Sequence, residues 1–165
     1  MLESMEASAL ATWIRESPSI FAFTLVLILH AIGLGMVVGL NTLIAVRVLG
    51  FAPLLPLGAL RGLWVPIWIA FIMNAVSGLG LFIAEATKMG TMNIFWVKMG
   101  FVLAGMAISL YMKKRYLDDA VAMSASTAPP SARPIAWAML ACWLLALISG
   151  RLTGYPELVN IWFGI

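Results

Sequence analysis

The chain has 165 residues, of which 63% are hydrophobic and only 10% are charged, and its formal net charge is +3. A soluble domain typically carries about 25% charged residues, so this composition excludes an ordinary water-soluble domain. A chain this short also cannot bury so much apolar surface in a core of its own. The excess apolar surface must face lipid, and we expect a single transmembrane domain over residues 1–165.

The positive charge does not indicate a nucleic-acid-binding protein. Basic residues are scattered over loops and helix ends, and the longest basic run is Lys113-Lys114-Arg115, whereas nucleic-acid binding depends on a concentrated basic surface. The single cysteine, Cys142, cannot form an intramolecular disulfide. The expected partners are the lipid bilayer and either other membrane subunits or further copies of the chain, with no nucleic acid.

The first predicted element is a short N-terminal interfacial helix. It combines Glu3, Glu6 and Arg15 with Trp13, a mixture of charged and aromatic residues that suits the membrane surface. We expect no signal peptide here, because acidic residues stand where a basic region is usual and the apolar stretch is too short.

Four apolar segments follow in the chain. A helix needs about 20 residues to cross a hydrocarbon core; three of the segments are near this length, and the first is long enough to tilt or protrude. Helices are expected because lipid cannot satisfy an open backbone. The predicted helices span about residues 19–46, 63–84, 94–112 and 134–150. The predicted fold class is therefore all-α, an integral membrane four-helix bundle.

The distribution of Lys and Arg orients this bundle, because cytoplasmic loops carry an excess of both. The first and third loops, with the adjoining helix ends, carry six: Arg47, Arg61, Lys113, Lys114, Arg115 and Arg133. The N-terminal region, the second loop and the tail carry four: Arg15, Lys88, Lys98 and Arg151. We predict a multi-pass protein of the bacterial inner membrane with both termini in the periplasm.

Polar residues within the spans are informative because each is costly in lipid unless it has a partner. His30 lies near the middle of the first span, and Asn41, 11 residues later, returns to nearly the same helix face. Beside them Ala31, Gly35 and Gly39 form a ridge of small residues that lets another helix approach closely. Similar polar and small stripes, predicted to face the bundle, are Asn74, Gly78, Leu81 and Glu85 in the second span and Lys98, Val102, Gly105 and Ser109 in the third.

Three roles are open to His30. Its imidazole could be a satisfied polar group, bonded to a backbone carbonyl or to Asn74. It could be an axial ligand to haem iron and hence the metal ligand of the chain. It could also donate a hydrogen bond to a quinone headgroup or relay protons.

A second candidate site lies where the second helix ends and the third begins. Glu85 and Lys98 flank this turn and are expected to form an ion pair, which Arg151 at the same end of the fourth span could join. One carboxylate with two cations leaves positive charge to spare, which suits an anionic group such as a haem propionate or a lipid phosphate.

These residues carry a family resemblance. His30, followed by glycines and then Arg47-Val48-Leu49-Gly50, resembles the His…Gly…(Asp)-Leu-Arg-Leu-Leu-Gly pattern of a group of uncharacterised bacterial four-helix membrane proteins. Phe95-Trp96-Val97-Lys98 resembles the Phe-x-x-Lys that opens the third helix of that group, and Gly150-Arg151-Leu152-Thr153-Gly154-Tyr155 resembles its closing Gly-Arg-x-x-x-Tyr.

That group is similar to the copper-resistance-D-like and cytochrome b-like membrane proteins. The resemblance implies a four-helix fold and binding of haem b. Two departures bear on this implication. Ala45 stands where the group usually has Asp, and one histidine cannot supply the two axial ligands that cytochromes of this architecture use.

No catalytic constellation is present in the sequence, so we do not expect an enzyme acting on its own. The leading hypothesis is a small membrane subunit of a redox or electron-transfer system, with haem b bound through His30 and with Lys98, Arg151, Glu85 and Asn41 as further cofactor-site candidates. The alternative is a cofactor-free scaffold or assembly subunit that packs against partner helices through the small-residue ridge. A quinone-binding or transport-related subunit is the third hypothesis.

Overall fold

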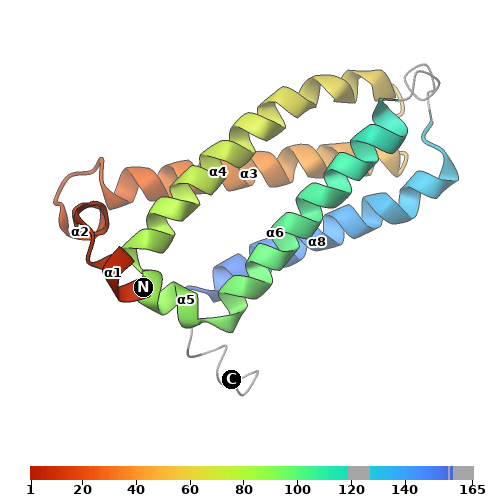
Figure 1. Cartoon of the computed structure of the whole chain (residues 1–165). Helices are drawn as coiled ribbons and strands as arrows, with labels where there is room; N and C mark the ends of the chain where they lie inside the picture. Colours follow the sequence, from red (N-terminus) through yellow and green to blue (C-terminus); the bar gives the residue numbers. More distant parts are fainter. Residues whose placement is uncertain (119–126, 156, 158–165) are drawn as a thin grey trace.

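The computed structural model describes residues 1–118, 127–155 and 157, and throughout these the chain is helical or in loops, without strands. Four helices are long and apolar enough to cross a membrane, and three of them are continued at one end by a short helical element. They are α3 (Phe23–Val48), α4 (Trp64–Ala84), α6 (Asn93–Met112) and α8 (Arg133–Leu152) (Figure 1). The chain is thus an all-α, multi-pass membrane bundle, as predicted.

Short elements lie at the two ends of the bundle. At the end that we call the α5 end are α1 (Leu2–Glu6), α2 (Ala9–Glu16) and α5 (Ala86–Thr91). At the opposite end, the η1 end, are η1 (Leu57–Leu63), η2 (Lys113–Leu117) and η3 (Pro130–Ala132). Two predictions need correction: the interfacial helix is divided into two, and the first span begins at Phe23 rather than at residue 19.

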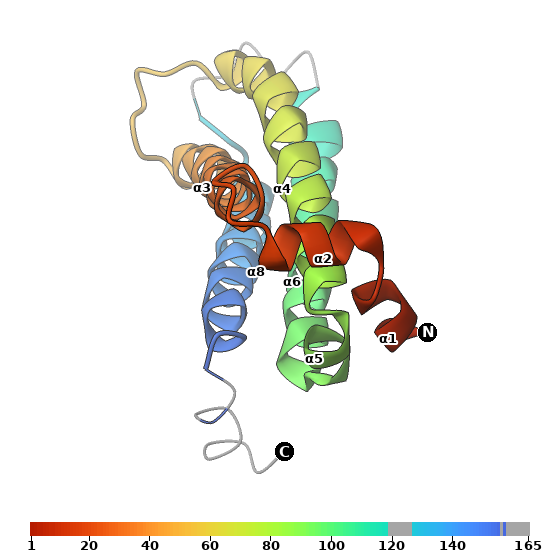
Figure 2. The same ribbon diagram turned by 90° about the vertical axis from the view of Figure 1, so that its left-hand side faces the viewer.

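The division near the N-terminus has a local cause. The side chain of Ser8 accepts a hydrogen bond from the backbone N–H of Ala11 at 3.3 Å, so that Ser8 caps α2 and separates it from α1. Helix α2 then lies across α4, with Ala11 and Ile14 buried on its inner side. Figure 2 shows α2 crossing the bundle at a steep angle to the long helices.

The four long helices associate as two antiparallel pairs. Helix α3 packs along α4 and α6 packs along α8, while α3 and α8 join the pairs. Helices α4 and α6 are linked by side chains near their ends. Phe82 stacks on Phe95 with ring centroids 5.2 Å apart at the α5 end, and Lys113 Nζ lies 5.8 Å from the ring centroid of Trp64 at the η1 end.

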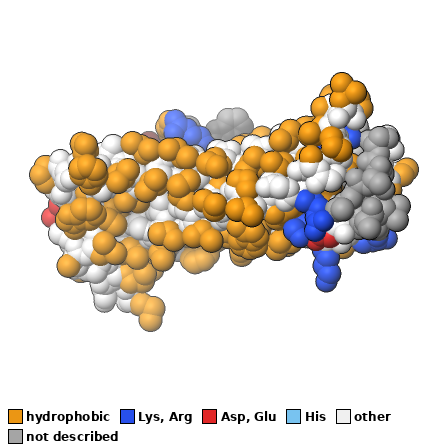
Figure 3. Space-filling view, turned by 90° about the horizontal axis from the view of Figure 1, so that it is seen from above, with side chains coloured by type: hydrophobic (Ala, Val, Ile, Leu, Met, Phe, Trp, Pro, Cys, Tyr) orange, Lys and Arg blue, Asp and Glu red, His pale blue; other side chains and the backbone are white. Residues whose placement is uncertain are grey.

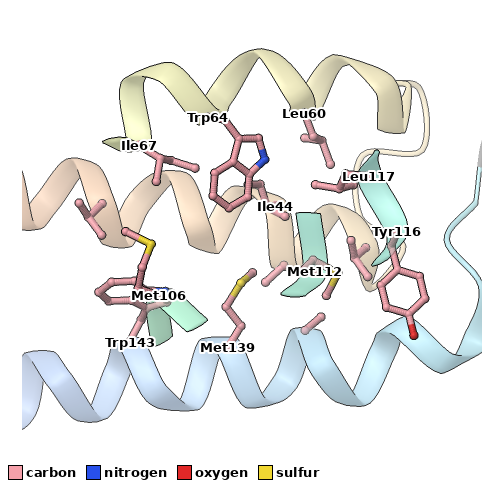
Figure 4. Close-up of a cluster of buried hydrophobic side chains, with 14 of the residues drawn as sticks. Ile44, Leu60, Trp64, Ile67, Met106, Met112, Tyr116, Leu117, Met139 and Trp143 are labelled. Carbon is pink, nitrogen blue, oxygen red and sulfur yellow. The ribbon is translucent and has the colours of Figure 1, made fainter. Parts of the chain in front are cut away.

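The largest cluster of buried apolar side chains lies in the half of the bundle toward the η1 end (Figure 4). All four long helices contribute to it, with Ile44, Trp64, Met112 and Trp143 among its members. Trp143 packs against Gly105, where an added Cβ would lie 3.1 Å from the indole. The half toward the α5 end contains the polar interior side chains described next.

Candidate functional site

The imidazole of His30 lies half-buried between α3 and α4 and is held by α4. Its Nδ1 is 3.0 Å from the backbone oxygen of Asn74. Because a carbonyl oxygen can only accept, Nδ1 carries the proton and donates. The prediction that this ring bonds to a backbone carbonyl or to Asn74 is confirmed.

Ser77 supports the same tautomer. Its Oγ lies 3.3 Å from Nδ1 of His30, and it donates its own proton to the backbone oxygen of Met73 at 2.6 Å. The hydroxyl oxygen is therefore available to accept from the ring. In the neutral ring Nε2 is then the unprotonated nitrogen of His30, and it makes no hydrogen bond within the described residues.

Asn74 and His30 bind one another in both directions. The side-chain amide of Asn74 donates to the backbone oxygen of His30 at 2.9 Å, while the backbone oxygen of Asn74 accepts from the His30 ring. A side-chain donor in the middle of a helix thus reaches across to the neighbouring helix, where water cannot replace its partner. This pair fixes the register of α3 against α4.

Two glycines allow this close approach. A Cβ added at Gly33 would lie 2.8 Å from the backbone nitrogen of Asn74, and one added at Gly78 would lie 2.9 Å from Cε1 of His30. The ridge of Ala31, Gly35 and Gly39 does not make this contact. All three are exposed, and nothing lies within 4 Å of an added Cβ at either glycine of the ridge.

Lys98 enters the same interior region from α6. It packs against α8, where a Cβ added at Gly150 would lie 3.4 Å from Cε of Lys98, and its positive charge acts electrostatically on His30. Lys98 is half-buried and has neither an ion pair nor a side-chain hydrogen bond in the part of the chain that the structure describes. Such a charge favours an anionic group beside it.

The predicted cluster of Glu85, Lys98 and Arg151 is not formed. Glu85 pairs instead with Lys88, three residues later, at 3.4 Å. Arg151 donates to the hydroxyl of Tyr155 at 2.8 Å, with its guanidinium carbon 5.0 Å from the ring centroid. Glu85 is followed at once by α5, so its cation partner is local in the sequence. Of the three residues, Lys98 is the one whose charge acts electrostatically on His30.

Asn41 is fully buried on the inner side of α3, as its stripe with His30 predicts, but it does not belong to the same site. The two residues lie about 16 Å apart along the helix axis, reckoned from the rise per residue. Asn41 donates to the backbone oxygen of Val37 at 2.8 Å, and its Oδ1 has no hydrogen-bond partner among the described residues. It belongs to the core.

The sequence analysis did not predict the contacts of two residues, Ser77 and Arg47. Ser77 carries a readable signal, since it follows Asn74 by one helical turn on the same face. Arg47 was used for the topology and for the family resemblance, without a structural role, yet it is 1% exposed. Its Nε donates to the backbone oxygen of Leu55 at 2.6 Å and its Nη2 to that of Pro53 at 3.4 Å. Arg47 therefore fastens the first interhelical loop.

Within the described residues no group of three or more His, Cys, Asp or Glu side chains could hold a metal ion. The chain matches no protein-family model, no curated protein and no solved structure. The arrangement that remains is an imidazole held between α3 and α4 by its Nδ1 bond to Asn74, with the charge of Lys98 acting on it electrostatically.

Proposed function

We propose that the chain is a small membrane subunit of a redox system that binds haem b through Nε2 of His30. The observation that carries this proposal is the hydrogen bond from Nδ1 to the backbone oxygen of Asn74. A carbonyl that accepts from one ring nitrogen orients a ligating histidine and directs the lone pair of the other nitrogen toward the metal. The sequence motifs that resemble a group of bacterial four-helix membrane proteins, itself similar to cytochrome b-like membrane proteins, support the same proposal.

The residues present fit a haem at one ligand position, that of the His30 imidazole. The haem would supply one-electron exchange; the chain supplies a fixed imidazole, and Lys98 supplies a cation suited to a propionate. His30 is the single histidine of the sequence, so the opposite axial position is open, is taken by a methionine, or is filled by another subunit.

The tautomer favours this function over recognition of a quinone carbonyl. A carbonyl oxygen needs a donor, and Nε2 of the tautomer set by Asn74 is an acceptor. A quinone-binding role would therefore require either a second proton on the ring or movement of the proton from Nδ1, at the cost of the hydrogen bond to the carbonyl of Asn74.

A cofactor-free scaffold is the second candidate function. The observation that favours it is the exposure of Ala31, Gly35 and Gly39 on the outer side of α3, with open space around both glycines. A ridge of small residues in a membrane helix is typical of a contact with another helix. A partner subunit or a second copy of the chain would pack there.

The site belongs, in this proposal, to a bacterial inner-membrane protein with both termini in the periplasm. Support comes from the basic residues, six of which lie in or beside the elements of the η1 end and four toward the α5 end. The site around His30 then lies in the periplasmic half of the bilayer.

Absorbance of the protein purified from haem-replete cells tests the haem proposal. We expect a Soret band that is lost in His30→Ala and kept in Lys98→Met with weaker haem retention. Arg151→Gln is the matched control, because Arg151 binds Tyr155 rather than the site, and it should leave the spectrum unchanged. Absence of a Soret band in the wild type, or its full retention in His30→Ala, would reject the haem proposal.

A further inference from the structure

An apolar groove runs along the outer side of the bundle between α6 and α8. Its volume is about 430 Å³, within the range of sites that hold small ligands. It is lined by Ala107, Ile108 and Tyr111 of α6 and by Pro134, Ile135 and Ala138 of α8. Tyr111 and Pro134 lie near the ends of their helices, so the groove opens toward the η1 end.

Two arginines flank this open end. The guanidinium carbon of Arg115 lies 5.4 Å from the ring centroid of Tyr116, and that ring meets the ring of Tyr111 edge-on at 6.5 Å. Arg133 immediately precedes Pro134 in the chain. Arg115 is thus linked through Tyr116 to Tyr111 in the α6 wall. Arg133 adjoins Pro134 in the α8 wall. One cation therefore lies near the end of each wall of the groove.

Both arginines are exposed, and neither forms an ion pair in the described part of the chain. The nearby acid Asp118 is already engaged, with Lys113 at 2.6 Å and Arg61 at 3.3 Å. Figure 3 shows the wider setting: hydrophobic side chains cover most of the visible face, while Lys and Arg gather mainly toward one end. Among the residues that the structure describes, the mouth of the groove therefore offers positive charge without a competing carboxylate.

We propose that this groove binds an anionic phospholipid, with an acyl chain between α6 and α8 and its phosphate on Arg115 and Arg133. The apolar walls match an acyl chain, and guanidinium groups bind phosphate oxygens through paired N–H donors. Basic clusters at the end of a membrane helix select anionic over zwitterionic lipid for the same reason. The site is separate from His30 and does not depend on the haem proposal.

Native mass spectrometry of the full chain in detergent tests the lipid site. Phosphatidylglycerol and phosphatidylcholine with identical acyl chains are titrated, and we expect phosphatidylglycerol to bind more tightly. Arg115→Gln and Arg133→Gln should each weaken phosphatidylglycerol binding about fivefold, the equivalent of about 1 kcal/mol per basic side chain. They should weaken phosphatidylcholine binding less, because the choline cation offsets the charge of the phosphate. Ala138→Phe, which fills the groove, should weaken both lipids.

Lys88→Gln is the matched control, since it removes one positive charge at the α5 end. It should leave both affinities unchanged. Equal affinity for the two lipids, or an equal loss in Lys88→Gln and Arg133→Gln, would overturn the proposed headgroup site. Unchanged binding in Ala138→Phe would overturn the acyl-chain groove, and the exposure of Ala138 makes a folding defect an inadequate explanation of a loss.

Discussion

The imidazole of His30 lies against the backbone of Gly78, so closely that a Cβ at position 78 would stand 2.9 Å from Cε1 of the ring. The ring cannot swing away freely, because Nδ1 is bound to the carbonyl of Asn74 in the preceding turn of the same helix. The glycine and the histidine thus form one packing unit across the α3–α4 contact.

Gly78→Ala should destabilise the bundle. The added methyl would displace the His30 ring, and overpacking of this kind costs about 1–3 kcal/mol. Gly39→Ala is the control, because nothing lies within 4 Å of its added Cβ and it reports the gain in helix propensity, about 1 kcal/mol at most, by itself. Thermal unfolding in detergent should place Gly78→Ala below Gly39→Ala, and equal midpoints would contradict the packing unit.

Arg47→Met should destabilise the first interhelical loop strongly. It removes the charged donor for the backbone oxygens of Leu55 and Pro53, and a hydrogen bond to a charged group contributes about 1.5–3 kcal/mol. Lys114→Met applies the same substitution to an exposed basic residue at the same end and should change stability by less than about 1 kcal/mol. Denaturation in detergent compares the two, and similar losses would show that Arg47 has no structural role.

Glu6 should make the attachment of α1 pH-dependent. The N–H of Thr87 donates to its carboxylate at 2.8 Å, and hydrogen bonds from Thr87 hold the pKa of Glu6 below its ordinary value of 4.5. A carboxyl whose pKa is lowered by folding stabilises the fold above its unfolded pKa and loses that contribution as pH falls through the folded value.

The unfolding midpoint of Glu6→Gln should therefore be lower than that of the wild type near pH 6, and the two should converge as pH falls below 4.5. Glu3→Gln, on the exposed side of the same short helix, is the comparison variant. It should follow the wild type at every pH. If the unfolding midpoint of Glu6→Gln stays below that of the wild type by the same amount at low pH, the carboxylate of Glu6 is not the cause of the difference in stability.

The proposed topology predicts the accessibility of the two bundle ends. In a Cys142→Ala background, Ser4→Cys should react with a membrane-impermeant maleimide added to intact cells, whereas Thr127→Cys should react after permeabilisation only. Both positions are exposed, at the α5 end and beside η3 respectively. The reverse pattern would invert the orientation and place the His30 site in the cytoplasmic half of the membrane.

The sequence by itself determined the number, type and approximate limits of the long helices. Apolar segments near 20 residues must become helices in lipid, because no other conformation satisfies their backbone groups there. The inward faces of α4 and α6 followed from helical spacing: Asn74 and Gly78 do face α3, and Gly105 and Ser109 do face Trp143.

Tertiary packing alone decided which side chains meet. Sequence spacing placed Ala31, Gly35 and Gly39 on a ridge suited to close contact, but Gly33 makes the contact with α4, because the register is fixed by the exchange of hydrogen bonds between His30 and Asn74. In the same way Glu85 forms its ion pair with Lys88 and not with Lys98, whose charge acts instead on His30. Helical periodicity fixes directions around one helix axis, whereas the rotation and offset of one helix against another depend on contacts that no single segment contains.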